Sequence, residues 1–201
     1  MTTKLATKPK GSKKSSTRQT LLKAAREALM AGEGAAEMGV IAKGAGVSVG
    51  LAYHHFGSKA GLIAAVVEDF YDRYTETVNA RFDGASWSER ERKRTVALVD
   101  FFLDDDFART LLGPLGRSPE VVNAEASCMA GMIELGARNI AAGQASGELD
   151  AQMDPMLAGA FVLGGVRQCL TVALANSDQP DRQTLADAAW RHIAHALGAT
   201  P

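Results

Sequence analysis

The sequence predicts an all-α protein of about nine helices, and three observations support this prediction. Apolar residues recur at spacings of three and four over most of the chain. No run of alternating β-branched residues, which would indicate a strand, interrupts them. Glycine, proline and capping residues separate the periodic segments. With 201 residues, the chain is long enough to bury a sizeable core in one or two domains.

The N-terminal part of the chain predicts an arm followed by short helices. Residues 1–14 are polar and basic and are interrupted by proline and glycine, so we expect them to be disordered. Serine and threonine at 15–17 offer N-caps for a first helix, which should end before Gly32. A second, shorter helix is expected at 38–45. Its inward-facing residues are Met38, Ile41 and Ala42.

A tight turn and a third helix follow. Glycines favour a turn over residues 44–47, and Ser48 is a good N-cap for a helix of less than two turns at 49–55. Ser58 caps a fourth helix, whose apolar stripe is about four turns long. This helix is expected to end near Asp83.

Five further helices are predicted in the remaining chain. The first of them begins after Ser86 or Ser88 and runs to about residue 103. Proline suits the first position of a helix, so Pro119 marks the start of the longest one. The other expected ranges are 107–112, 119–144, 154–175 and 183–197.

The formal net charge of −1 conceals an uneven distribution along the chain. Residues 1–60 hold 10 basic and 3 acidic side chains, a net charge of +7. Residues 61–201 hold 12 basic and 20 acidic side chains, a net charge of −8. This sorting favours contact with a polyanion at one end of the chain, although a solubilising tail explains the charge equally well.

The second and third predicted helices have the spacing of a helix-turn-helix. In this motif the N-terminal end of the second helix enters a DNA major groove about 12 Å wide, so its first side chains must be small. Val49 and Gly50 occupy the first two positions of the helix at 49–55 and meet that requirement.

From Ile41 to Leu62 the sequence reads IAKGAGVSVGLAYHHFGSKAGL. This segment resembles the pattern IAxxAGVSxGxxYxHFxxKxxL of the TetR family of transcriptional regulators. The resemblance implies a nine-helix homodimer, usually a repressor, that binds a palindromic operator in double-stranded DNA and responds to a small molecule. It also implies three regions: a basic arm at 1–14, a DNA-binding domain at 15–75 with its last helix shared to about 83, and a ligand-binding and dimerisation domain at 84–201.

Each DNA-contact candidate has a physical rationale. The Ser48 hydroxyl and the free N–H groups of the helix it caps can bind a phosphate. The resemblance assigns base contacts to the first turn of that helix, and Tyr53 lies on the same face as Val49. Lys59 opposes the dipole of the next helix, which suits a phosphate contact. The full set is Ser48, Val49, Gly50, Leu51, Tyr53, His54, His55, Lys59, Lys13, Lys14 and Arg18.

Other residues of this segment have different expected roles. Ala52 and Phe56 should lie in the core. Gly39 stands where family members often carry a residue that reads a base, and Glu37 stands where serine or threonine commonly caps the second helix. A carboxylate at position 37 would repel phosphate. Because Gly39 has no side chain to read a base, we expect sparse base readout and an affinity that depends on phosphate contacts elsewhere, with Lys13, Lys14 and Arg18 reaching the backbone or the minor groove.

The C-terminal region should hold an apolar effector and the dimer contact. Small-molecule sites are mostly apolar with few polar anchors. Ligand-binding candidates are Phe101, Phe102, Phe107, Cys128, Met129, Met132, Phe161 and Gln168. Glycine inside a helix costs about 1 kcal/mol relative to alanine, and either close helix approach or room for a ligand offsets that cost. Gly159 is such a glycine, and the dimer candidates are Gly164, Gly165, Trp190, Ile193 and Leu197.

Alternative functions rest on weaker patterns. The sequence GVSVG at 46–50 matches the nucleophile elbow of α/β-hydrolases, which requires a preceding strand that is not predicted. His192 and His195 have the spacing of a metal pair without an evident third ligand. A small-molecule carrier with an incidental helix-turn-helix is a further alternative. We expect no enzymatic activity, cofactor or metal.

The remaining expectations concern the cysteines and the cellular location. Cys128 and Cys169 are too few for a disulfide framework and are expected to be buried thiols. No apolar run was expected to approach the roughly 20 residues of a membrane span. The chain is therefore predicted to be cytoplasmic, without a membrane partner.

Overall fold

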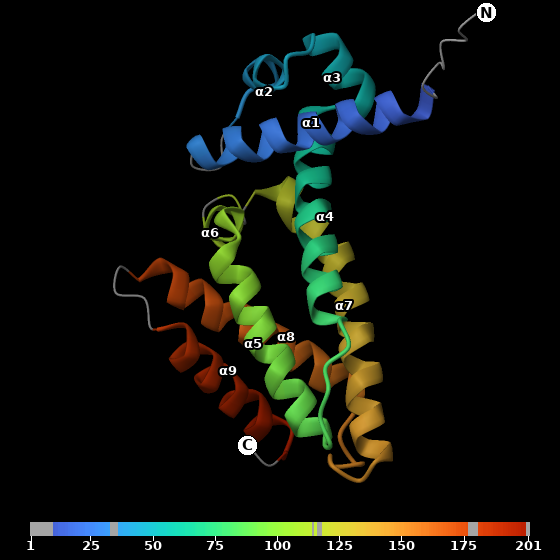
Figure 1. The fold of residues 1–201 in the computed structure, drawn as a ribbon, viewed down its shortest axis with the longest axis vertical. Coiled ribbons are helices and arrows are strands. Elements are labelled where there is room, and N and C mark those ends of the chain that lie inside the picture. Colours follow the sequence, from blue (N-terminus) through green and yellow to red (C-terminus); the bar gives the residue numbers. More distant parts are fainter. Residues whose placement is uncertain (1–9, 33–35, 114, 116–117, 177–180, 200–201) are drawn as a thin grey trace, which may run out of the picture. The chain divides into compact units, whose positions relative to one another are not determined.

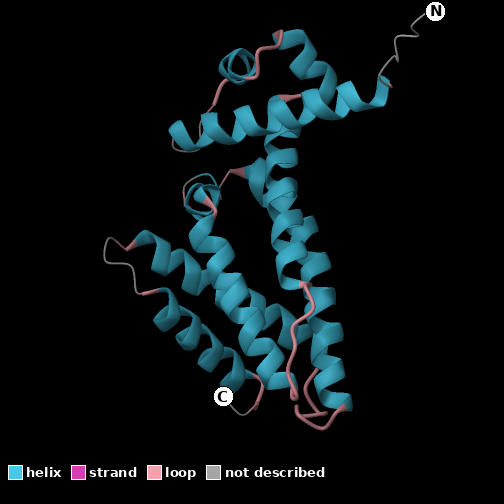
Figure 2. Ribbon diagram, in the orientation of Figure 1, coloured by secondary structure: helices cyan, strands magenta, loops and turns pink. Residues whose placement is uncertain are grey.

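The computed structural model describes residues 10–32, 36–113, 115, 118–176 and 181–199. Nine α-helices form the regular structure of these residues, and no strand occurs among them (Figures 1 and 2). The predicted all-α class is therefore confirmed. The chain divides into two compact units, Met1–Val66 and Val67–Pro201.

The first unit contains α1 (Lys10–Ala31), α2 (Met38–Gly44), α3 (Val49–Phe56) and the start of α4 (Lys59–Val78). Its buried side chains come from the predicted apolar faces of all four helices. They include Leu21, Ala25, Leu29, Met38, Ile41, Ala42, Ala52, Leu62 and Val66. Phe56 was also expected in the core, but it is only half-buried, with the Arg18 guanidinium 5.4 Å from its ring centroid.

The start of α1 differs from the sequence prediction. The helix begins at Lys10, so residues 10–14 are helical rather than part of a disordered arm, and the predicted caps at 15–17 lie inside it. The Thr20 hydroxyl donates to the Ser16 carbonyl at 2.9 Å, as expected one helical turn apart. No proline occurs between Lys10 and Ala31, and lysine is a good helix former, so nothing local stops the helix earlier. Residues 1–9 lie outside the described part of the chain.

The end of α4 also differs from the prediction. The helix stops at Val78, five residues before the expected Asp83, and the boundary between the two units falls inside it, after Val66. The Arg94 guanidinium donates from Nε to the Val78 carbonyl at 2.6 Å. This bond satisfies a carbonyl that the end of the helix would otherwise leave without a partner.

The second unit contains the rest of α4 and five more helices, all within two residues of the predicted ranges. They are α5 (Trp87–Asp104), α6 (Asp106–Leu112), α7 (Pro119–Ala145), α8 (Pro155–Ala175) and α9 (Arg182–Ala196). Each has a serine or aspartate N-cap that accepts a backbone N–H. For α5 the cap is Ser86 rather than Ser88, because Glu89 N donates to Ser86 Oγ at 3.1 Å.

Two helix pairs dominate the packing of the second unit, α8 against α7 and α9 against α5 (Figure 1). Trp87 of α5 and Trp190 of α9 are buried with ring centroids 6.3 Å apart. At the other contact, a Cβ added to Gly159 would lie 3.2 Å from the Ile133 carbonyl oxygen. The predicted close approach at Gly159 is therefore a contact between α7 and α8 of the same chain.

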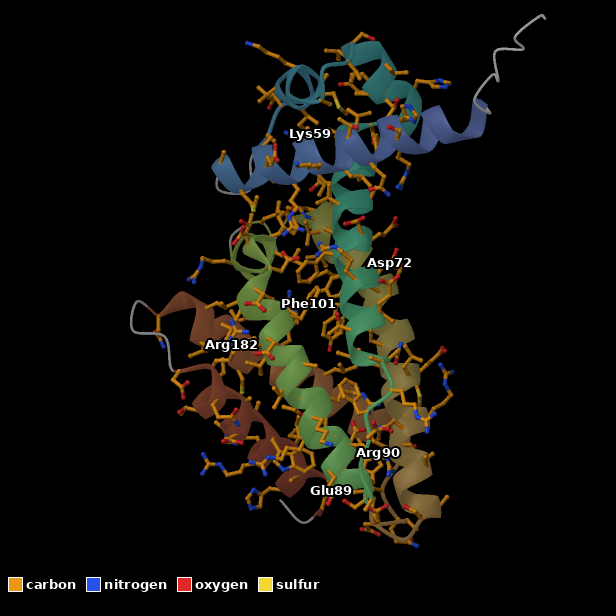
Figure 3. All side chains as sticks on the ribbon, viewed as in Figure 1. Lys59, Asp72, Glu89, Arg90, Phe101 and Arg182 are labelled. Carbon is orange, nitrogen blue, oxygen red and sulfur yellow. The ribbon has the colours of Figure 1, made fainter. Side chains whose placement is uncertain are left out.

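Ion pairs join the same helices. Arg182, at the start of α9, donates to Asp100 at 2.9 Å and to Asp104 at 2.6 Å (Figure 3). The Arg182 hydrogen bond lowers the pKa of Asp104. Glu125 of α7 is buried, and it accepts from the Tyr71 hydroxyl and from Arg167 Nη2 at 2.9 Å.

The apolar character of α8 exceeds the sequence expectation. By length and mean hydropathy (1.6) alone, Pro155–Ala175 is apolar enough to cross a membrane, so the statement that no run approaches that length was wrong. Only a third of that window is buried, and its Arg167 is paired with Glu125. The helix therefore packs on α7 with one face and exposes apolar residues on another.

Candidate functional site

A tight turn positions α3 after α2. Gly46 has φ of +66°, a conformation that favours glycine, and its N–H donates to the Lys43 carbonyl at 3.1 Å. Val47 N then donates to the Ala42 carbonyl at 3.0 Å. Ser48 Oγ accepts from Leu51 N at 3.2 Å, so Ser48 is the N-cap of α3, as predicted.

The first turns of α3 expose apolar side chains. Val49 is 42% exposed, Leu51 37% and Tyr53 45%, whereas Ala52 is fully buried. Ser48, Gly50 and His54 are exposed and His55 is half-buried. The structure therefore brings the predicted α3 residues together on a helix that keeps only one buried side chain for the core. Large exposed apolar groups that gather on one element indicate an interaction surface.

Gly50 has no packing role within the chain. A Cβ added there would meet no atom within 4 Å. Because glycine in a helix costs about 1 kcal/mol relative to alanine, the residue lowers the stability of α3 without a benefit to internal packing. Packing within the described chain therefore does not account for the glycine.

The basic candidates lie in different settings. Lys59 Nζ is 3.5 Å from Glu37 Oε1, so the predicted phosphate-binding lysine forms an ion pair (Figure 3). Arg18 is exposed beside Phe56. Lys13 and Lys14 belong to α1, but their side chains lie outside the described residues.

Two residues of α2 were missed by the sequence reasoning. Val40 is 61% exposed, and Lys43 is exposed in the last turn of the helix. The signal for both was available, because helical periodicity that turns Ile41 and Ala42 inward turns positions 40 and 43 outward. Both are therefore exposed on α2, the helix that precedes α3 and contacts it.

A cavity of about 160 Å³ lies in the second unit, lined by α4, α5, α7, α8 and α9. Most of its wall is apolar, and the polar side chains in it include Tyr74, Glu91, Arg94 and Asn139. The carboxylate of Glu91 accepts from Arg94, so the two charges form a pair. A smaller neighbouring space of about 20 Å³ shares Tyr74 and Met132 with this cavity.

Few of the predicted ligand residues line the cavity. Met132 does, and Phe102 and Met129 line the smaller space beside it. Phe107 is fully buried in an aromatic cluster around Phe70 that also contains Phe101. The structure does not bring Cys128, Phe161 or Gln168 into the cavity wall. Phe161 is 71% exposed, and Gln168 is exposed on the same helix.

The exposed face of α8 carries the predicted glycines. Gly164 and Gly165 are exposed, between Leu157 (72% exposed) and Val172 (54%). A groove of about 370 Å³ follows this face and the neighbouring surface of α9. Ile193 is half-buried in the wall of the groove. Trp190 and Leu197, also predicted at the dimer contact, belong instead to the buried core of the unit.

The cysteines do not match the expected pair of buried thiols. Cys128 is half-buried, and desolvation together with the nearby carboxylates of Glu68 and Asp72 raises the pKa of its thiol. Cys169 is exposed in the α8–α9 groove. Cys169 is accessible because it lies on the exposed side of α8. The expectation that its thiol is buried was therefore wrong.

The alternative sites find no support in the geometry. Ser48 follows a helix rather than a strand, and its hydroxyl accepts a backbone N–H as a helix cap. His192 and His195 are exposed on α9. No group of three or more potential metal ligands occurs among the described residues.

Comparisons with known proteins agree with this arrangement. A family model described as bacterial regulatory proteins, tetR family, matches residues 21–66, which include α2 and α3. No curated protein gives a match.

Solved structures match nearly the whole chain. Salmonella enterica GusR is 24% identical with a TM-score of 0.75, covering 92% of this chain and 96% of its own. NalD, the secondary repressor of the MexAB-OprM multidrug efflux pump in Pseudomonas aeruginosa, is 22% identical (TM-score 0.67, coverage 91% and 97%). Bacillus subtilis FadR in complex with stearoyl-CoA is 19% identical (TM-score 0.74, coverage 89% and 98%). Residues 21–66, which hold the helix-turn-helix segment, therefore match the tetR family of bacterial regulatory proteins, and the fold of the chain is similar to that of these solved structures.

Proposed function

We propose that this protein is a cytoplasmic, homodimeric transcriptional repressor that releases its operator when a small molecule binds the second unit. The observation that carries the proposal is the exposed N-terminal half of α3. Val49, Gly50 and Leu51 are exposed there, and they contribute nothing to the packing of the core. Small and apolar groups at a helix N-terminus suit close entry into a major groove, where they contact thymine methyl groups.

Phosphate contacts supply most of the affinity in this proposal. Ser48, Tyr53 and Lys59 flank the base-facing turn, and the first 60 residues carry a net charge of +7. Lys13, Lys14 and Arg18 are three of the basic residues in this segment, and all three belong to the sequence of α1. Binding should therefore weaken steeply with salt.

The exposed apolar face of α8 supports the homodimer. Leu157, Phe161 and Val172 lie at spacings that keep them on one side of the helix, with Gly164 and Gly165 between them. A second copy of the same face would bury these residues, and the glycines would let the two backbones approach closely. Two copies of α3 would then read half-sites about 34 to 36 Å apart, or a multiple of that distance.

The cavity of the second unit supports the response to an effector. NalD is a repressor, and FadR of Bacillus subtilis is a transcriptional regulator solved with stearoyl-CoA, so a similar fold occurs in a regulator that holds a ligand. A ligand shifts the protein between two states only by its difference in affinity for them. We infer that the effector favours a state in which the two copies of α3 no longer fit adjacent half-sites.

A shift assay with the DNA upstream of the protein's own gene, and of its neighbours, tests the proposal. We expect binding that weakens with salt, and a uniform loss of affinity for all duplexes in Lys59→Ala and Tyr53→Phe. Retention of full duplex affinity by the Tyr53→Ala, Lys59→Ala double variant would falsify the docking mode. Failure to shift any upstream DNA argues for the carrier alternative.

A further inference from the structure

The cavity of about 160 Å³ in the second unit is bordered by a tyrosine, Tyr74. Tyr74 is 5% exposed and borders both the cavity and the smaller space beside it. Among the described residues, none forms a hydrogen bond with its hydroxyl. Its neighbour Tyr71, by contrast, donates to Glu125. A hydroxyl that lines a cavity and has no hydrogen bond within the described chain is available to a molecule in that cavity.

The charges around the cavity are already neutralised. Arg94 donates to the Glu91 carboxylate and, through Nε, to the Val78 carbonyl. In the smaller space, Arg167 donates to both carboxylate oxygens of Glu125 at 3.0 and 2.9 Å. A charged ligand would lose its hydration without gaining an unpaired counter-charge, which is unfavourable.

The volume limits the size of the ligand. Apolar protein cavities of about 150 Å³ accept benzene. The cavity here has nearly that volume, and the residues around it include Leu98, Ile140 and Val162. A ligand held wholly inside this space is therefore about the size of one aromatic ring.

We propose that the cavity binds a small, uncharged molecule of about one aromatic ring, with a hydroxyl or similar group that pairs with the Tyr74 hydroxyl. This proposal rests on the proposed function, because it specifies the chemistry of the effector. Burial raises the pKa of Tyr74, so its hydroxyl stays protonated and serves as donor or acceptor. Asn139, half-buried in the same wall, offers a second polar contact.

Calorimetric titration of the full-length protein without DNA tests the proposal with four probes of one ring each. The probes are p-cresol, toluene, benzoate and benzylammonium. We expect p-cresol to bind about fivefold more tightly than toluene, because only p-cresol hydrogen-bonds Tyr74. Benzoate and benzylammonium should bind at least tenfold more weakly than p-cresol.

The Tyr74→Phe variant removes the hydroxyl and keeps the ring. In this variant the affinities for p-cresol and toluene should be nearly equal, and the affinity for toluene should be unchanged. The comparison follows the logic of a double-mutant cycle, with one hydroxyl removed from the ligand and the other from the protein. An unchanged ratio in a variant with the wild-type melting temperature would overturn the proposal. If the variant does not fold, the four wild-type affinities decide: tighter binding of either ion, or binding of none, contradicts the proposal.

The outcome is separable from that of the proposed function. DNA binding is measured on the same preparation by the shift assay. A protein that shifts DNA but binds none of the probes loses only this inference. A protein that binds p-cresol as expected but shifts no DNA is a ligand-binding protein and not a regulator.

Discussion

Glu37 and Lys59 form an ion pair that joins the N-terminus of α2 to the first turn of α4, with Nζ 3.5 Å from Oε1. The Glu37 side chain is 82% exposed and the Lys59 side chain 42%, so the pair contributes little to the stability of the fold. Its effect is on the charge available to DNA, because Glu37 neutralises a lysine proposed to bind phosphate.

Glu37→Gln should therefore raise the affinity for duplex DNA by about two- to fivefold at low salt. The plot of log affinity against log salt should become steeper by up to about 0.9, the contribution of one phosphate contact. Fluorescence anisotropy with labelled operator measures both. Glu27→Gln is the matched control, because Glu27 forms an exposed pair with Lys23 on α1. Equal effects of the two substitutions would show that only net charge matters.

Gly50→Ala should change stability and DNA binding in opposite directions. The added methyl group meets no atom of the chain, so the variant should be more stable by up to about 1 kcal/mol. The same methyl group occupies space proposed for the DNA backbone or bases, so operator affinity should fall about tenfold. Gly131→Ala in α7 is the control, since its added Cβ also meets no atom within 4 Å. Wild-type affinity in Gly50→Ala would contradict the proposed role of the glycine.

Phe161→Asp should convert the protein to a monomer. The side chain is 71% exposed at the centre of the apolar face of α8, and a carboxylate there would be buried against a second copy. Analytical ultracentrifugation measures the molecular mass, and affinity for a full palindrome should fall with it. Val122→Asp, at an exposed position of α7, should leave the mass unchanged. A dimeric Phe161→Asp variant would place the subunit contact elsewhere.

Glu125→Ala should destabilise the second unit by about 1 to 3 kcal/mol. The substitution removes the partner of Arg167 and of the Tyr71 hydroxyl. A fully buried pair would cost about 3 to 5 kcal/mol, but the Arg167 side chain is 31% exposed and water partly compensates. The midpoint of urea unfolding measures the change. Glu134→Ala, exposed on the same helix, should change it by less than about 0.5 kcal/mol.

The helices and the helix-turn-helix were predictable because their signals are local. The caps at Ser48 and Ser58 and the glycine turn before α3 each act within a few residues, and all three appear as expected. The C-terminal end of α4 was not predictable in the same way. The end of α4 is satisfied by Arg94, a residue 16 positions along the chain, and no local pattern encodes that contact.

The cavity could not be predicted from residue types. Phe107 and Met132 both occupy apolar positions of predicted helices. In the structure Phe107 is fully buried in the core, whereas Met132 lines the cavity. Tyr74 was not predicted as a ligand-binding residue because it belongs to the apolar stripe of α4. That pattern does not indicate whether the tyrosine hydroxyl has a hydrogen-bond partner. That information depends on how α4, α5, α7 and α8 pack together, and packing is a property of the folded chain.

The two cysteines are expected to differ in their reactivity toward thiol reagents. Thiol reagents act on the thiolate, and burial together with nearby carboxylates raises the pKa of Cys128. Cys169 is exposed beside Gly165 in the α8–α9 groove. A maleimide dye should therefore label the native protein at one defined position without any engineering, and slower labelling at higher protein concentration would report directly that this groove becomes covered.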